Sequence, residues 1–223
     1  MKNLLIITTN YSGENCENEC IKNTGVYLEE FAVPFLIFEK SNIEMTVASI
    51  QGGVSPVDES SMSCSNPEEW DKCIKILRNT KCLYDIDYKK FDGVYFPGGH
   101  GPLFDIAENK KVIEIVEDFY SSGKIVSAIC HGVCALINAK TCGNIPIVKD
   151  KYITSFTNEE EHIAKLTELV PFSVEDELRK AGANFIAKEP WAEHVEVSQN
   201  IITGQNQNST TLLAEKVYRT ISE

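Results

Sequence analysis

The 223-residue chain contains no apolar run near the ~20 residues that a membrane-spanning helix needs. It is also poor in positive charge, since 21 Lys and Arg stand against 33 Asp and Glu, a formal net charge of −12. Nucleic acids and anionic membrane surfaces bind through clustered Lys and Arg, so we expect neither as a partner. The apolar start at residues 2–7 is too short for a signal peptide and lacks a small-residue cleavage site. We expect a first β-strand there and a cytoplasmic protein.

The eight cysteines form no disulfide or metal-binding pattern. Cys16 and Cys20 have the spacing of half a metal site, but no histidine or second pair follows at the spacing of a zinc finger. Without a signal peptide, and at this length, free thiols are expected rather than a disulfide framework. The sequence therefore predicts no metal site at these cysteines.

Short apolar runs alternate with helical patterns along the whole chain. Strands are predicted at residues 4–8, 45–49, 93–97, 125–129, 152–154, 184–187, 195–197 and 201–203. Helices are predicted at 25–40, from 66 with Asn66 as cap, at 110–120, from 133, and at 158–169, 171–181 and 210–221. This βαβα order predicts one α/β domain over residues 1–223, with a flavodoxin-like, doubly wound, mostly parallel sheet covered by helices on both faces. In such sheets, binding sites lie at the carboxyl ends of the strands.

Cys130 and His131 stand between the strand at 125–129 and the helix expected from Val133. A sharp turn here lifts a side chain out of the sheet and directs backbone N–H groups and a helix dipole at it. Because the positive helix end favours a thiolate, we expect Cys130 to ionise more readily than a core cysteine. The alternative is a buried structural cysteine, which is the usual place of a free thiol and the interpretation that suits Cys134.

A second glycine-rich turn, residues 98–101, follows the strand at 93–97. It is too short for a phosphate loop and lacks the Lys-Ser/Thr ending. Its glycines let the backbone pass close to a ligand, and the amides of Gly99 and His131 could form an oxyanion hole beside the Cys130 sulfur. An ordinary tight turn is the alternative interpretation. The expected oxyanion-hole and substrate-binding residues are Gly98, Gly99 and His100.

Glu30 interrupts the apolar face of the helix predicted at residues 25–40. Surface exposure is the common reason for a carboxylate at such a position. Pro34, four residues later, could break the helix and expose its inner edge, from which a carboxyl could act as a proton shuttle for a thiol.

Three consecutive acids, Glu159, Glu160 and Glu161, follow Asn158. They could belong to a helix start in which Asn158 is the cap and Glu161 takes the reciprocal position of a capping box. Alternatively, one of them could orient His131. The residues alone do not distinguish the three acids.

Five stretches carry a resemblance to a known family: residues 24–26 with Glu30 and 34–35; 96–101 with Asp105; 128–132; 155–161; and 171–172 through 175–178 to 182–183. A sixth, 203–206, matches less closely. In order and spacing they resemble the ThiJ/PfpI superfamily, related to class I glutamine amidotransferases, over nearly the whole chain. Within it, the chain is similar to the branch of glyoxalase III and of heat-shock chaperones with amidase-like sites.

The resemblance implies the roles of four residues: Cys130 as nucleophile, His131 as catalytic histidine, Glu30 as the acid that contacts the thiol, and Glu161 as the acid that completes a triad. The chain departs from the branch at Val133 and Gln207, where proline is usual. Neither position carries one of these roles, but both could reshape the wall of the pocket.

The resemblance further implies a cofactor-free conversion of a small 2-oxoaldehyde, methylglyoxal, to lactate, with no metal and with a homodimer as the assembly. The carboxyl beside the sulfur must be protonated at rest, or it would repel the thiolate, which predicts a raised pKa for Glu30. Two other functions stay open. One is an amidase, peptidase or protein deglycase, which needs His131 and Glu161 aligned; the other is a non-enzymatic stress chaperone or thiol redox sensor.

Overall fold

The computed structural model describes residues 2–14, 21–63 and 65–222, so Cys16 and Cys20 lie outside the described residues. A seven-stranded sheet has the order β3-β2-β1-β4-β5-β9-β8. Its strands are β1 (Asn3–Thr8), β2 (Glu44–Ser49), β3 (Lys81–Cys82), β4 (Gly93–Phe96), β5 (Ile125–Ile129), β8 (Val195–Ser198) and β9 (Ile201–Gly204). All neighbours are parallel except β8, which runs antiparallel to β9. β6 (Tyr152–Ile153) and β7 (Asn184–Phe185) form a separate parallel pair. The predicted mostly parallel α/β fold is confirmed.

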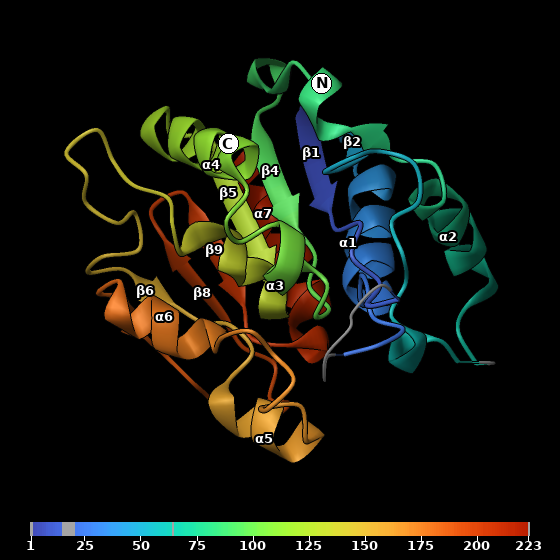
Figure 1. The fold of residues 1–223 in the computed structure, drawn as a ribbon. Coiled ribbons are helices and arrows are strands. Elements are labelled where there is room, and N and C mark those ends of the chain that lie inside the picture. Colours follow the sequence, from blue (N-terminus) through green and yellow to red (C-terminus); the bar gives the residue numbers. More distant parts are fainter. Residues whose placement is uncertain (1, 15–20, 64, 223) are drawn as a thin grey trace.

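Helices cover both faces of this sheet (Figure 1). They are α1 (Leu28–Lys40), α2 (Asp71–Leu77), α3 (Pro102–Asp105), α4 (Lys110–Ser121), α5 (Asn158–Ala164), α6 (Val174–Lys180) and α7 (Thr210–Ser222). α1 packs against α7 on one face, while α4 and the 3₁₀-helix η5 (Cys130–Leu136) lie on the other. α5 and α6 lie beyond the carboxyl ends of the central strands, at the bottom of Figure 1. Within the described residues, no helix is long and apolar enough to cross a membrane.

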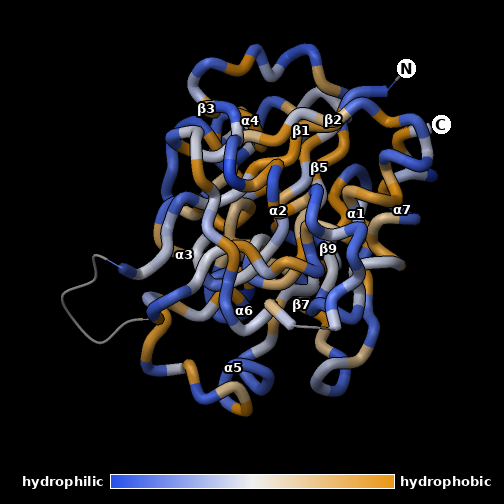
Figure 2. Tube along the Cα trace, turned by 90° about the vertical axis from the view of Figure 1, so that its right-hand side faces the viewer, coloured by the Kyte–Doolittle hydropathy of each residue, from blue (hydrophilic) through white to orange (hydrophobic). Residues whose placement is uncertain are grey.

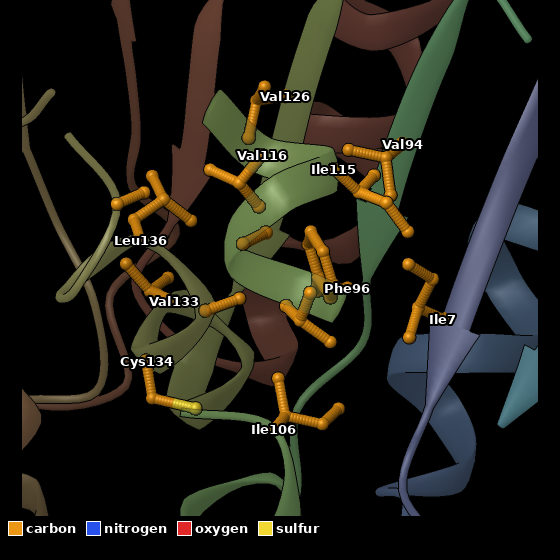
Figure 3. Packing of buried hydrophobic residues seen from close by; sticks show 14 of the residues in the cluster. Ile7, Val94, Phe96, Ile106, Ile115, Val116, Val126, Val133, Cys134 and Leu136 are labelled. Atoms are coloured by element: carbon orange, nitrogen blue, oxygen red, sulfur yellow. The ribbon is translucent and has the colours of Figure 1, made fainter. Parts of the chain in front are cut away.

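The central strands bury both of their faces, which is why they form near-continuous apolar runs in the sequence. Successive side chains alternate between the two layers, as the period of a strand requires. Leu4, Ile6 and Tyr95 face α1 and α7. The opposite layer joins strand residues to α4 and η5 (Figure 3), among them Ile7, Val94, Phe96, Ile115, Val116, Val133 and Leu136. Figure 2 shows the hydrophobic residues gathered in these strands, with mostly hydrophilic loops outside.

Pro34 does not break α1, contrary to the expectation from the sequence. A proline has no N–H to donate to the carbonyl four residues earlier, which here belongs to Glu30. The hydroxyl of Tyr95, on β4, donates to that carbonyl instead. α1 also begins at Leu28 rather than Gly25, because Val26 forms a parallel bridge with Val57 before the helix starts. The Glu30 turn is therefore tied to the sheet by a side chain.

Other helix boundaries differ from the prediction because local hydrogen bonds decide them. Asn66 caps no helix: its side chain donates to the Ser61 carbonyl, and a 3₁₀-turn at Glu68–Trp70 precedes α2. α5 ends at Ala164, where Lys165 adopts a left-handed conformation with φ of 62°. α6 begins at Val174 rather than at residue 171, because the Ser173 side chain caps it.

No α-helix starts at Val133. The segment forms η5, a 3₁₀-helix that begins at Cys130 itself. A Cβ on Gly132 would lie 2.5 Å from the Phe96 carbonyl oxygen and 2.6 Å from that of Pro97. The segment therefore runs directly against the backbone that leaves β4, and glycine at residue 132 permits this approach.

Candidate active site

The order of the strands in the sheet reverses direction between the paired neighbours β1 and β4. From β1 the chain proceeds to β2 and β3 on one side, and then to β4, β5 and β9 on the other. Ligands bind at such a switch point, outside the carboxyl ends of the strands. Gly98 follows β4 and Cys130 follows β5, so both glycine-bearing turns lie at this edge, as predicted.

Cys130 occupies a sharp, strained turn. Its φ of 56° lies in the left-handed region that non-glycine residues rarely adopt, and such strain concentrates at functional sites. Its side chain faces Gly98, where a Cβ would lie 2.8 Å from the Cys130 Cβ and 2.4 Å from Oε2 of Glu30. Glycine at residue 98 thus lets the thiol and the carboxyl share one small space.

Glu30 is completely buried beside this thiol. Its Oε2 accepts the N–H of Gly98 at 2.9 Å, while Oε1 is buried without a regular hydrogen-bond partner among the described residues. Burial raises the pKa of Glu30 to about 8, although contacts with Cys130 and the Gly98 amide lower it in part. The predicted rise in this pKa is confirmed. Gly98, expected to bind substrate, uses its amide to hold Glu30.

The thiol of Cys130 does not ionise readily, contrary to the expectation from its position. Burial and then the nearby Glu30 raise the pKa of Cys130 well above its usual value, and the His131 amide lowers it only in part. A short 3₁₀-helix cannot offset the loss of water around a thiolate. At rest, near neutral pH, the thiol is protonated and needs a base.

His131 is that base by position. Its Nδ1 lies 3.3 Å from the Cys130 sulfur, and its Nε2 lies 2.6 Å from Oε2 of Glu161. Burial alone would raise the pKa of Glu161, but His131 and His100 outweigh it and hold this pKa well below the usual range. The ionised carboxylate accepts a hydrogen bond from Nε2–H, which leaves the Nδ1 lone pair facing the thiol. Burial also lowers the pKa of His131, so the imidazole is neutral.

A capping box decides which acid reaches His131. Thr157, not Asn158, is the cap of α5, and Glu160 takes the reciprocal position by accepting the Thr157 amide at 2.9 Å. Glu160 is buried and also accepts the side-chain amide of Asn206 at 2.7 Å. Glu161 is next along the helix and therefore faces the histidine, while Glu159 is exposed. The expected cap at Asn158 is wrong by one residue.

His100 joins the same group from the turn after β4. Its Nε2 lies 2.9 Å from Oε1 of Glu161, so one carboxylate binds two imidazoles. The ring centroids of His100 and His131 are 4.1 Å apart. Phe156 packs against His131 with 4.6 Å between the ring centroids. These contacts orient both rings. The donor set of two histidines and one carboxylate could also hold a metal ion, since its ligand atoms lie within 4.8 Å of one another.

A cavity of about 150 Å³ opens onto the thiol. Its wall consists of Tyr27, Glu30, Ser60, Gly99, His100, Cys130, His131, Phe156, Ala164, Leu166, Trp191 and Gln207. Gly99 has a φ of 90°, and its amide has no acceptor among the described residues. No motif in the sequence singles out Tyr27, Leu166 or Trp191, which tertiary folding brings to the site. Trp191 alone carried a signal, because only two tryptophans occur in the chain.

A strained cysteine at the end of a central parallel strand, with a histidine beside it and an acid behind the histidine, defines a class of α/β proteins with a cysteine-centred site. Comparison with protein families identifies the group within that class. Residues 20–220 match the model of the DJ-1/PfpI family. The chain belongs to the DJ-1/PfpI family.

Similar proteins include several glyoxalases. Glyoxalase 3 of Candida albicans is 31% identical over 211 residues, covering 88% of this chain and 89% of that protein. A glutathione-independent glyoxalase of Schizosaccharomyces pombe is 26% identical over 234 residues, covering 96% and 95%. The crystal structure of Candida albicans glyoxalase III has a TM-score of 0.86 at 29% identity, covering 98% and 96% of the two chains. The X-ray structure of the Rapid Encystment Protein of 24 kDa from Francisella tularensis has a TM-score of 0.91 at 36% sequence identity. The match covers 99% of each of the two chains.

Proposed function

We propose that the protein is a cofactor-independent glyoxalase that converts methylglyoxal to lactate, with Cys130 as the nucleophile. The observation that carries this proposal is the buried pair of Cys130 and Glu30 in one small cavity. A carboxyl with a pKa of about 8 can both donate and accept a proton near neutral pH. The names of the glyoxalase relatives support the same activity.

The cavity suits a small, neutral substrate. Its volume is about 150 Å³, and no lysine or arginine belongs to its described wall. A glutathione adduct, which is large and carries two carboxylates, would meet the acid Glu30 and find no cation. A three-carbon 2-oxoaldehyde has neither problem, so the cavity favours a reaction without glutathione.

The first step makes the nucleophile. The Nδ1 of His131 takes the thiol proton, and the Cys130 thiolate attacks the aldehyde carbon of methylglyoxal. The resulting hemithioacetal oxygen lies against the amides of Gly99 and His131, which donate hydrogen bonds to its developing charge. Glu161 stabilises the imidazolium that forms.

The second step moves a proton between the two carbons. The His131 imidazolium first gives its proton to the hemithioacetal oxygen. Glu30 in its ionised form, or the neutral His131, then removes the proton from the former aldehyde carbon and gives an enediol. The same proton returns to the neighbouring carbon, which produces a lactoyl thioester on Cys130. Water then breaks the thioester into lactate and the free thiol, so one methylglyoxal and one water give one lactate.

The experiment is a lactate assay with methylglyoxal, in the absence of glutathione and metal, for the wild type, Cys130→Ala and Glu30→Gln. The proposal expects lactate from the wild type and none from either variant. The aligned Cys130, His131 and Glu161 also favour a hydrolase as second candidate, which does not need Glu30 as a base. A Glu30→Gln variant that hydrolyses esters or amides, together with a wild type that forms no lactate, would select the hydrolase.

A homodimer and a cytoplasmic location are further parts of the proposal: the family resemblance implies the first, and the second is expected from the short apolar start of the sequence. Sedimentation velocity of the purified protein tests the first: a single species of twice the 24.9 kDa chain mass supports it, and a monomer at all concentrations refutes it. A stress-protective role would accompany the removal of a toxic aldehyde.

A further inference from the structure

The proposed reaction ends with the hydrolysis of a thioester, and this step needs a base for the attacking water. The cavity wall contains five titratable side chains: Tyr27, Glu30, His100, Cys130 and His131. Cys130 carries the acyl group, Glu30 or His131 moves the proton between the carbons, and Nδ1 of His131 faces the sulfur. Burial raises the pKa of Tyr27 to about 12, so its phenol stays protonated. Only His100 is left without a task.

The geometry of His100 suits this step. Its Nε2 lies 2.9 Å from Oε1 of Glu161, and in a neutral imidazole this contact to a carboxylate places the proton on Nε2 and the lone pair on Nδ1. Nδ1 has no partner among the described residues and is not sealed from solvent. The side chain is 13% exposed, on the wall of the cavity that contains the Cys130 sulfur.

Glu161 therefore holds two histidines in the same tautomer for two successive tasks. On one oxygen it holds His131, whose free nitrogen faces the thiol. On the other it holds His100, whose side chain lines the cavity and whose Nδ1 has no hydrogen-bond partner among the described residues. The ring centroids are 4.1 Å apart, and a positive charge on His100 would lower the pKa of His131.

We propose that His100 is the base that activates water to hydrolyse the lactoyl thioester on Cys130, an inference that rests on the proposed function. Nδ1 of His100 takes a proton from water while the water oxygen bonds to the thioester carbon. The carbonyl oxygen, as it becomes an oxyanion, accepts a hydrogen bond from the Gly99 amide. The carbon–sulfur bond then breaks, its electron pair stays on sulfur, and the proton held by His100 passes to the sulfur through solvent.

The test uses His100→Gln, because a glutamine keeps an N–H that can reach Glu161 but has no basic nitrogen. His162→Gln, an exposed position on α5, is the matched control. After exposure to methylglyoxal, His100→Gln is expected to carry one lactoyl group on Cys130 by mass spectrometry. The adduct should survive gel filtration, unlike a reversible hemithioacetal, and leave with hydroxylamine. Its steady-state lactate production should fall by about 10²–10⁴-fold, while His162→Gln matches the wild type.

Two results overturn the inference while the proposed function holds. Full turnover by His100→Gln means that this residue only positions Glu161. Lost turnover without an acyl adduct means that it acts before the thioester forms. Failure of the proposed function is distinct, since the wild type itself then makes no lactate. A melting curve verifies that His100→Gln is folded, and His100→Asn replaces it if it is not, with the same outcomes expected.

Discussion

The hydroxyl of Tyr95 replaces the backbone donor that Pro34 cannot supply to the Glu30 carbonyl. Tyr95→Phe removes this donor and leaves a completely buried carbonyl without a partner. Such a loss costs about 1–3 kcal/mol of the free energy of unfolding. The same change should lower lactate production, because the released turn carries the Glu30 side chain.

A second substitution makes the prediction specific. In the background of Tyr95→Phe, Pro34→Ala restores an N–H four residues after Glu30, so the helix can satisfy the carbonyl by itself. We therefore expect Pro34→Ala to recover about 1–2 kcal/mol in that background and to have little effect in the wild type. Tyr88→Phe is the control for the loss of a tyrosine hydroxyl elsewhere in the protein. That hydroxyl donates to the side chain of Glu114, outside the site, at 2.9 Å, so Pro34→Ala should not compensate its loss.

The assay is urea denaturation of the four members of the Tyr95 and Pro34 cycle, followed by circular dichroism. A shift of the midpoint at constant slope reports the change in the free energy of unfolding. The reasoning is refuted if Tyr95→Phe is as stable as the wild type. It is also refuted if Pro34→Ala changes the free energy of unfolding by the same amount in both backgrounds, because Tyr95 and Pro34 then do not act on the same carbonyl.

Three further predictions concern the site itself. Gly98→Ala places a Cβ 2.4 Å from Oε2 of Glu30, so lactate production should nearly vanish; Gly123→Ala, with nothing within 4 Å, should keep activity and lose only about 1 kcal/mol of stability in urea. Glu161→Gln should lower kcat for lactate by about 10²–10⁴-fold because His131 loses its tautomer, and unchanged kinetics of that variant would contradict its role; the exposed Glu159→Gln should match the wild type. The pKa of Glu30 rises from 4.5 in the unfolded chain to about 8, so the folded protein binds the extra proton between these values. Its stability contribution is complete below pH 4.5 and is lost as pH rises through about 8, at up to roughly 1.4 kcal/mol per unit; urea titrations across pH should show a flatter profile for Glu30→Gln.

The central strands β1, β4, β5 and β9 were predictable because their apolar runs are buried on both faces. The two-residue strand β3 was not predicted, since it is too short to form such a run. Helix ends were less predictable, because single hydrogen bonds decide them. The cap of α5 lies at Thr157 instead of Asn158, and this shift by one residue brings Glu161 to His131. Pro34 lies inside α1, and a tyrosine distant in sequence satisfies the carbonyl that the proline leaves without a backbone donor.

At the site, local sequence predicted the sharp turn at Cys130, and the need for a protonated carboxyl beside the sulfur predicted the raised pKa of Glu30, which burial causes in the structure. The prediction of an acidic thiol was wrong. Burial and the neighbouring carboxyl of Glu30 raise the pKa of Cys130, and the helix that follows it is too short to offset them. The link between His100 and Glu161 joins segments 61 residues apart, and no local pattern indicates such a contact. Trp191 likewise reaches the cavity through the tertiary fold, and no local pattern in the sequence indicates this position.

The most direct test of the central claim is lactate formation from methylglyoxal by protein treated with EDTA and freed of glutathione. Cys130→Ser is compared there with Cys142→Ser, which removes an exposed free thiol. We predict that the wild type and Cys142→Ser produce lactate at equal rates while Cys130→Ser produces none. Lactate from Cys130→Ser at the wild-type rate, or none from the wild type, would contradict a cysteine-dependent glyoxalase that needs no cofactor.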